Sequence, residues 1–357
     1  MAKTGRAGVV KVLGGACAVT LIIGCGSGGD ATPGAGGSAA NTGGASGAVG
    51  VAGSGQGGSV AGATSSPDGC RPQLVKPEEN PKAVKLVTQE VAPGAGATRI
   101  TSVAVYGESV IYTTSSGMYR IPKAGGVAET MTSQGVINHL FVVGDNVYYM
   151  GGKTLYSVPA GATGVMPTKV IETTLEIGSD YLFAIDATSA YAWVRPTDSI
   201  EALALADGTV TTLLTGQESE NWLLNGDTIY YAGANNAVMK LPKTGGTPQL
   251  VYQTGHSLWA PGIDGTQLYY GGSMLLQKVD PPNEKTLMTA GVGFIEQIVP
   301  QGDLLLWAGW EGSVGYLAKD GSRCGTVVDQ VHGFADWAHD DANFYIALEN
   351  AIYRIPF

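Results

Sequence analysis

Charged side chains are scarce in this chain of 357 residues: they make up 14% of the sequence, and the net charge is −10. Lys and Arg together number only 20, against 30 Asp and Glu. A protein that follows the phosphates of a nucleic acid needs clustered Lys and Arg on one face. The composition therefore argues against nucleic-acid binding and is typical of a soluble, exported protein.

The common sequence signatures of catalysis are missing as well. Residues 67–357 contain no Gly-x-Ser-x-Gly nucleophile elbow, and no turn carries the Ser-x-Asp-x-Gly-x-x-Trp box of sialidases. The run Gly94-Ala95-Gly96 is too short for a phosphate-binding loop, and no helix is expected after it. We therefore expect no enzyme activity and no bound cofactor.

The N-terminal apolar segment is too short to span a membrane. Residues 1–11 carry three positive charges, and residues 12–24 form an uncharged stretch of thirteen that ends in glycine. A membrane-spanning helix needs about 20 apolar residues. A basic start followed by a short apolar stretch predicts a signal peptide over residues 1–24.

This signal peptide ends in Ile22-Ile23-Gly24-Cys25, which resembles the bacterial lipobox. The resemblance implies that Cys25 carries a diacylglycerol thioether, becomes the acylated N-terminus and anchors the exported protein in a membrane. Lipoproteins retained at the inner membrane typically have Asp after this cysteine, whereas this chain has Gly26. We therefore expect the outer membrane, on its periplasmic side or at the cell surface. The alternative is an ordinary signal peptide with a chance cysteine.

A glycine-rich segment separates the lipobox from the rest of the chain. Residues 26–66 are nearly all Gly, Ala, Ser and Thr, and Asp30 carries their only charge. Such a segment cannot offset its ordering entropy by burial and is expected to remain a flexible coil. We predict a lipidated tether over residues 25–66, an N-terminal extension over residues 67–99 and a folded domain over residues 100–357.

The folded domain is built from an internal repeat. A tight turn followed by a strand with a closing aromatic residue recurs, as in Gly144-Asp145-Asn146-Val147-Tyr148-Tyr149 and Gly226-Asp227-Thr228-Ile229-Tyr230-Tyr231. The closing aromatics are 37 to 44 residues apart and are Tyr112, Tyr149, Trp193, Tyr231, Tyr270, Trp307 and Tyr345. A constant period of this length indicates a repeat architecture.

Each clear copy continues into a second strand that ends at proline, as in Met118-Tyr119-Arg120-Ile121-Pro122. Glycine turns and strand-ending prolines are typical of antiparallel hairpins. Four short strands fit a period of about 40 residues, which is one blade of a propeller. We therefore predict an all-β fold, a seven-bladed β-propeller, with copies that start near Ile100, Val136, Asp180, Ser219, His256, Phe294 and Gly333.

The last copy has room for only three strands, because the chain ends at Phe357. The strand-like residues 82–91 are expected to supply the missing strand and close the ring beside residues 351–356, since a bare edge strand tends to pair with other chains. Cys70 lies just before this segment and Cys324 lies in the sixth copy. In an oxidising compartment we expect them to form a disulfide across the seam. The alternative is two free thiols.

The fourth copy shows the repeat pattern most fully, as Tyr230-Tyr231, then Met239-Lys240-Leu241, then Gly245-Gly246. Over residues 100–357 this pattern resembles the YWTD and NHL groups of propellers. The acidic residue that ends the YWTD motif is absent, because Ala232, Thr113 and Met150 follow the aromatics. The resemblance implies a domain that binds proteins or other macromolecules.

The starts of the first strands are the expected ligand contacts, because in propellers they surround the mouth of the central channel. Aligning the copies places there a set that we call the inner ring: Ser102, His139, Tyr181, Asn221, Trp259, Gln297 and Asp336. Polar and aromatic side chains suit carbohydrate or peptide contacts. The alternative is that these side chains only solvate the channel entrance.

One run of acidic residues invites a metal-binding interpretation. Asp336-x-x-His339-Asp340-Asp341 combines carboxylates with an imidazole, which suit divalent cations. Asp340 and Asp341 fall where other copies have turn residues, however, so hairpin chemistry already explains them. We expect no metal site here.

These features favour a surface-displayed lipoprotein of the cell envelope that binds a protein or glycan ligand without catalysis. The alternative is a propeller hydrolase or lyase that acts on envelope polysaccharide.

Overall fold

A computed structural model of the protein describes residues 76–88, 99–134, 138–172, 182–194, 197–216, 221–309, 312–328 and 334–357. The predicted signal peptide, the lipidation site Cys25, the tether and Cys70 lie outside these residues. In the described part of the chain, no helix has the length and apolar character needed to cross a membrane.

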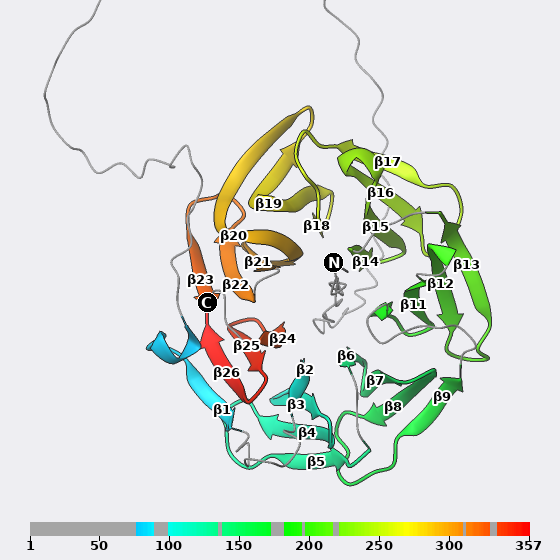
Figure 1. The fold of residues 1–357 in the computed structure, drawn as a ribbon, viewed down its shortest axis with the longest axis vertical. Coiled ribbons are helices and arrows are strands. Elements are labelled where there is room, and N and C mark those ends of the chain that lie inside the picture. The colour runs from blue at the N-terminus through cyan, green and yellow to red at the C-terminus, as the bar shows by residue number, and fades with distance from the viewer. Residues whose placement is uncertain are drawn as a thin grey trace, which may run out of the picture. The chain divides into compact units, whose positions relative to one another are not determined.

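The described residues form an all-β structure, as predicted, in which the non-strand elements are short turns such as the 3-10 helices η1 (Pro77–Glu79) and η4 (Ala234–Asn236). The sheets are arranged around a common centre, each with one edge strand toward the centre and the other edge strand at the rim (Figure 1). Inner strands such as Leu304–Gly309 and Asn343–Leu348 are buried along nearly their whole length. Both faces of these strands therefore pack against neighbouring sheets.

Four sheets have the four antiparallel strands expected of one repeat. The first contains β2 (Ile100–Tyr106), β3 (Ser109–Thr114), β4 (Gly117–Pro122) and β5 (Glu129–Thr132), and the second contains β6 (Asn138–Val143), β7 (Asn146–Gly151), β8 (Thr154–Pro159) and β9 (Thr168–Glu172). The third contains β10 (Leu182–Ile185), β11 (Ser189–Val194), β12 (Ser199–Ala204) and β13 (Val210–Thr215), and the fourth contains β14 (Trp222–Asn225), β15 (Thr228–Gly233), β16 (Ala237–Pro242) and β17 (Gln249–Gln253).

The next sheet has six strands and covers the fifth and sixth repeats. Its strands are β18 (Ala260–Asp264), β19 (Gln267–Asp280), β20 (Asn283–Gln301), β21 (Leu304–Gly309), β22 (Ser313–Ala318) and β23 (Cys324–Val328). In β19, the Gln267 side-chain amide donates to the Val279 carbonyl at 2.8 Å. Twelve residues of straight strand would separate these two positions by about 40 Å. Strand β19 therefore folds back on itself.

The last sheet combines the two ends of the described chain. Its strand order is β1, β26, β25, β24, with β1 at Val84–Thr88, β24 at Phe334–His339, β25 at Asn343–Leu348 and β26 at Ala351–Pro356. Strand β1 pairs antiparallel with β26, and Val84 lies opposite Arg354. Residues 84–88 of the segment predicted to lie beside the final strand do so.

A β-bulge recurs at one position on every outer strand. Opposite the third strand of each repeat, one apolar residue is skipped in the pairing register. The skipped residues are Leu86, Met131, Val170, Leu213, Val251, Leu287 and Val327. A bulge of this kind bends the strand and redirects a side chain. Strand β1 carries the same bulge as the outer strands of the other repeats.

Three bulged leucines contact a turn glycine of the following repeat. A Cβ atom at Gly125 would lie 3.9 Å from Leu86, one at Gly245 would lie 3.5 Å from Leu213, and one at Gly321 would lie 3.5 Å from Leu287. These are ordinary van der Waals distances, so the positive φ of the three glycines, +81° to +89°, and not a lack of space, is what favours glycine there. The Leu86–Gly125 contact lies between the last repeat and the first. It is equivalent to the Leu213–Gly245 and Leu287–Gly321 contacts, which lie between repeats that are consecutive in the chain.

The hydrophobic core lies between the sheets. Seven clusters of buried side chains are found in the described residues, and each combines side chains of two consecutive repeats. One joins Trp193 of the third repeat to Trp222 of the fourth, and another joins Tyr345 of the seventh to Tyr112 of the first.

Aligning the repeats by their closing aromatic residues, as the sequence suggested, differs by one residue from the observed strand pairing in two repeats. Tyr112 lies opposite Tyr119, and the positions that correspond to Tyr112 are Ala192 in the third repeat and Ile346 in the seventh. Trp193 and Tyr345 are their neighbours. Both repeats have an aspartate turn that is one residue longer than the glycine turns, and this places Tyr345 one residue before the equivalent position. Trp193 instead lies one residue after it.

Candidate functional site

Four of the first strands have a β-bulge at the inner-ring residue, and a fifth, in the third repeat, has one just after it. The register shifts fall between Ile100 and Ser102, Asn138 and Phe141, Leu182 and Ala184, Ile295 and Gln297, and Phe334 and Asp336. Bulges redirect side chains and are frequent beside binding sites. The inner ring therefore coincides with a recurrent distortion of the strands, which no sequence pattern indicated.

Asp336 and Ser102 connect three sheets at this position. The Ser102 hydroxyl donates to the Asp336 carboxylate at 2.6 Å, and the backbone N–H of Val103 donates to the same oxygen at 2.9 Å. The Ser102 oxygen also accepts a hydrogen bond from the backbone N–H of Leu140 at 3.1 Å. Ser102 is fully buried. We therefore assign Ser102 a structural role, in which it fixes β24, β2 and β6 relative to one another.

Gln297 continues this set of contacts. The indole N–H of Trp337 donates to the Gln297 side-chain oxygen at 2.6 Å, and the backbone N–H of Trp337 donates to Asp336 at 2.9 Å. Gln297 and Asp336 are partly exposed. The structure thus brings together three inner-ring residues, Ser102, Gln297 and Asp336, through one connected set of hydrogen bonds.

Trp259 forms a second part of the inner ring. Its ring and that of Phe294 lie 4.3 Å apart between centroids, with the planes tilted by 33°. We call these two residues the aromatic pair. Phe294 was not assigned to the ring from the sequence, because one residue was taken from each copy and Gln297 represented the sixth. The signal available was that Phe294 begins that copy.

The remaining inner-ring residues are less informative. Asn221 is buried at the start of β14. His139 lies in β6, but its side chain is not described, and Tyr181 lies outside the described residues. Their role in contacting a ligand stays a prediction.

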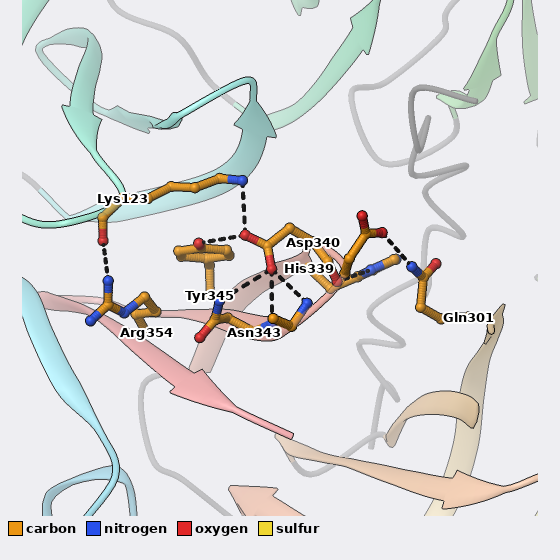
Figure 2. A network of polar contacts seen from close by, with 9 residues as sticks. Lys123, Gln301, His339, Asp340, Asn343, Tyr345 and Arg354 are labelled. Carbon is orange, nitrogen blue, oxygen red and sulfur yellow. Dashed lines mark hydrogen bonds and ion pairs between the residues drawn. The ribbon is translucent and has the colours of Figure 1, made fainter. Parts of the chain in front are cut away.

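The acidic run after Asp336 forms a turn that contacts the first repeat (Figure 2). One Asp340 oxygen accepts the backbone N–H groups of Ala342 at 2.9 Å and Asn343 at 2.8 Å. The other oxygen accepts the Tyr345 hydroxyl at 2.8 Å and lies 2.8 Å from the Lys123 ammonium. Among the described residues, no group of three or more His, Cys, Asp and Glu side chains is arranged to hold a metal ion.

His339 lies beside this turn and packs against Trp337, with ring centroids 6.0 Å apart. Its Nδ1 atom is 3.2 Å from the Asp340 carbonyl. Burial lowers the pKa of His339, and the nearby carboxylates of Asp340 and Asp341 only partly oppose this. The imidazole is therefore harder to protonate than that of an exposed histidine.

The third repeat contains a matching aspartate turn. Asp186 accepts the backbone N–H groups of Thr188 and Ser189 at 2.8 and 2.9 Å and the Tyr191 hydroxyl at 3.0 Å. Lys243 of the fourth repeat lies 3.2 Å from its carboxylate. In each case an aspartate turn is tied to the lysine after the proline of the next repeat, so the turn also joins two sheets.

These turns predict a loss of stability in acid. Burial tends to raise the pKa of Asp186, but hydrogen bonds from Thr188, Ser189 and Tyr191 outweigh it and bring the pKa to about 2. The unfolded chain, with its ordinary Asp pKa near 4, takes up the proton first. The contribution is therefore complete above about pH 5 and is lost as the pH falls toward 2.

We expect this carboxylate to contribute about 1 to 2 kcal/mol to the free energy of unfolding, after allowance for solvent screening at a partly exposed site. Denaturant unfolding at pH 6 and pH 3 measures the loss. An Asp186→Asn variant should lose less stability than the wild type over this interval. An equal loss in both proteins would show that Asp186 does not carry the effect.

Comparisons with known proteins identify the fold. No protein-family model matches the chain, and no curated protein matches its sequence. Similar solved structures include the WD40 domain of Neurospora crassa Pan2, at a TM-score of 0.54 and 12% identity over 80% of this chain and 98% of that one. The WD40 propeller domain of Doa1 has a TM-score of 0.53 and 11% identity over 76% of this chain and 96% of that one.

A third similar structure is PorZ, described as an essential bacterial surface component of the type-IX secretion system of Porphyromonas gingivalis. Its TM-score is 0.53 at 11% identity, over 77% of this chain and 39% of that one. Identities this low indicate a shared fold and not a shared activity. The chain has a β-propeller fold.

Proposed function

We propose that the protein is a non-catalytic binding module of the cell envelope, in which a lipid on Cys25 anchors a seven-bladed propeller whose inner ring contacts a protein or glycan ligand. The observation that carries the proposal is the inner ring itself, where partly exposed Gln297 and Asp336 are held in place by hydrogen bonds from β24 and β2. Fixed polar groups beside an aromatic surface are typical of binding sites.

Three observations support the count of seven blades. The described residues contain seven outer-strand bulges at one equivalent position. They also contain seven hydrophobic clusters, each between consecutive repeats. Since β19 folds back on itself, the six-stranded sheet supplies two blades.

The pairing of β1 with β26 supports closure of the ring, because β1 takes the place of the outer strand that the last repeat lacks. Cys324, at the start of β23, takes part in a disulfide bond. We infer that its partner is Cys70, which precedes β1 in the sequence. A disulfide between these residues would fasten the seam of the ring.

The envelope location rests on the sequence at Cys25, and the likeness to PorZ, a bacterial surface component, agrees with it. Incorporation of labelled palmitate into the wild-type protein, and its loss in a Cys25→Ser variant, would test the anchor. Label retained by the variant would argue against lipidation at this residue.

The binding function is tested with the purified full chain on an array of envelope glycans and peptides. Gln297→Ala is expected to reduce binding at least tenfold, because this side chain is partly exposed in the inner ring. Gln301→Ala is the matched control, since Gln301 is the last residue of the same strand, four positions after Gln297, and bonds to Asp341. Hydrolysis of an envelope polysaccharide, lost in the Gln297 variant, would favour the enzyme alternative.

A further inference from the structure

The aromatic pair is exposed in a way that sets it apart from the other tryptophans. Five tryptophans lie in the described residues, and Trp193, Trp222, Trp307 and Trp337 among them are at most 6% exposed. Trp259 is partly exposed, and so is Phe294. Exposing part of a large aromatic side chain forgoes burial that would otherwise stabilise the fold. This exposure therefore calls for a functional explanation.

Trp259 is held firmly in its position. Its backbone N–H donates to the Gly271 carbonyl at 2.8 Å, and its indole N–H donates to the Ser257 hydroxyl at 3.2 Å. Phe294, from the first strand of the next repeat, packs against the ring. Because its backbone, its indole nitrogen and part of its ring are already held in place, Trp259 loses little conformational entropy when a ligand binds.

Two glycines make this placement possible. A Cβ atom at Gly272 would lie 2.0 Å from the Ser257 carbonyl oxygen, and one at Gly271 would lie 2.6 Å from the Ile295 side chain. No other residue fits at either position without moving the backbone of residues 257–259 or the strand that carries Phe294. The close approach of these backbones thus positions both members of the aromatic pair.

The surroundings of the aromatic pair define the chemistry of its ligand. The residues that hold it, Ser257, Gly271, Gly272 and Ile295, carry no charge. An anionic ligand would need Lys or Arg there. The large apolar side chains that are most exposed in the described residues, Val84, Val127, Met166, Val210 and Leu250, lie on outer strands or in the turns before them. Within the part of the chain that the structure describes, the pair is thus a small surface without the wider apolar surround that an apolar peptide needs.

We propose that the aromatic pair is a subsite for a neutral sugar ring of a glycan, which packs its C–H face on Trp259. A pyranose has one apolar face and a rim of hydroxyl groups. A flat aromatic side chain with polar neighbours complements both, because the ring face attracts C–H groups and hydroxyl or amide groups bond the rim. Gln297, three residues after Phe294, and Ser257 are polar neighbours in the sequence on either side of the pair. This inference rests on the proposed binding function and specifies its ligand class.

The test uses the full chain on an array of neutral hexose and N-acetylhexosamine oligosaccharides, uronic-acid and sulfated oligosaccharides, peptides and immobilised choline. We expect binding to neutral oligosaccharides, reduced at least tenfold in Trp259→Ala and less in Trp259→Phe, which keeps an aromatic face. Met166→Ala, at a residue 78% exposed on a turn, is the control and should bind as the wild type does. Thermal melting establishes that each variant is folded.

The sugar subsite is wrong if neutral oligosaccharides bind equally to the wild type and Trp259→Ala, or if only anionic glycans, peptides or choline bind. Binding of another class that depends on Gln297 but not on Trp259 would overturn the subsite alone and leave the binding function standing. If no class on the array bound the wild-type chain, both proposals would fail.

Discussion

Replacing Asp340 with alanine is expected to lower the free energy of unfolding by about 3 kcal/mol or more. The carboxylate and the Lys123 ammonium are 2.8 Å apart, and their side chains are only 18% and 17% exposed. Removing one member of a largely buried ion pair leaves the other charge without its partner. The Tyr345 hydroxyl and two backbone N–H groups of the turn lose their acceptor at the same time.

Denaturant unfolding at pH 7 measures this change. The control is Asp303→Ala, because Asp303 forms an ion pair with Arg323 at 3.4 Å but its side chain is 80% exposed. Exposed pairs contribute little, so the unfolding midpoint of the control should stay close to that of the wild type. A similar, small change in both variants would mean that the Asp340 turn does not fasten the seventh repeat to the first.

Replacing Leu86 with alanine is expected to cost about 3 kcal/mol of unfolding free energy. Leu86 is the bulged residue of β1, is 8% exposed and lies over Gly125 of the first repeat. Truncating it leaves a cavity between the last sheet and the first. If β1 closes the ring, truncating a side chain between the last and the first sheet should cost as much stability as truncating one between two sheets that are consecutive in the chain.

Two variants make this comparison quantitative. Leu213→Ala removes the equivalent bulged leucine between the third and fourth repeats, where the side chain is 5% exposed, and should cost a similar amount. Val84→Ala, at a residue 40% exposed on β1 itself, should change stability by less than about 0.5 kcal/mol. A negligible effect of Leu86→Ala beside a large effect of Leu213→Ala would show that β1 is not needed to hold the fold together.

Predictions that depended on local chemistry agree with the structure. Glycine turns, strand-ending prolines and the repeat period predicted four-stranded units, and the first four sheets have them. The prediction that residues 82–91 lie beside the last strand followed from the missing fourth strand of the final copy. These inferences succeeded because turn and strand preferences act over a few residues and are repeated seven times along the sequence.

Predictions that required the exact register were less successful. The inner-ring alignment omitted Phe294, and the aromatic alignment was one residue off in the third and seventh repeats. In both cases a bulge or a different turn shifts the register without changing the local pattern of residue types. A one-residue shift moves a side chain to the other face of its strand, so small errors of this kind change which residues meet.

The sequence by itself determined the repeat, the strand-rich fold and the strand that pairs with the final one, because all of these follow from turn chemistry and periodicity. The tertiary structure alone decided that Asp336 meets Ser102, 234 positions away, that Lys123 of the first repeat meets Asp340 of the last, and that Trp259 packs on Phe294. Contacts across so many residues depend on how the sheets are arranged around their centre. No local preference encodes that arrangement.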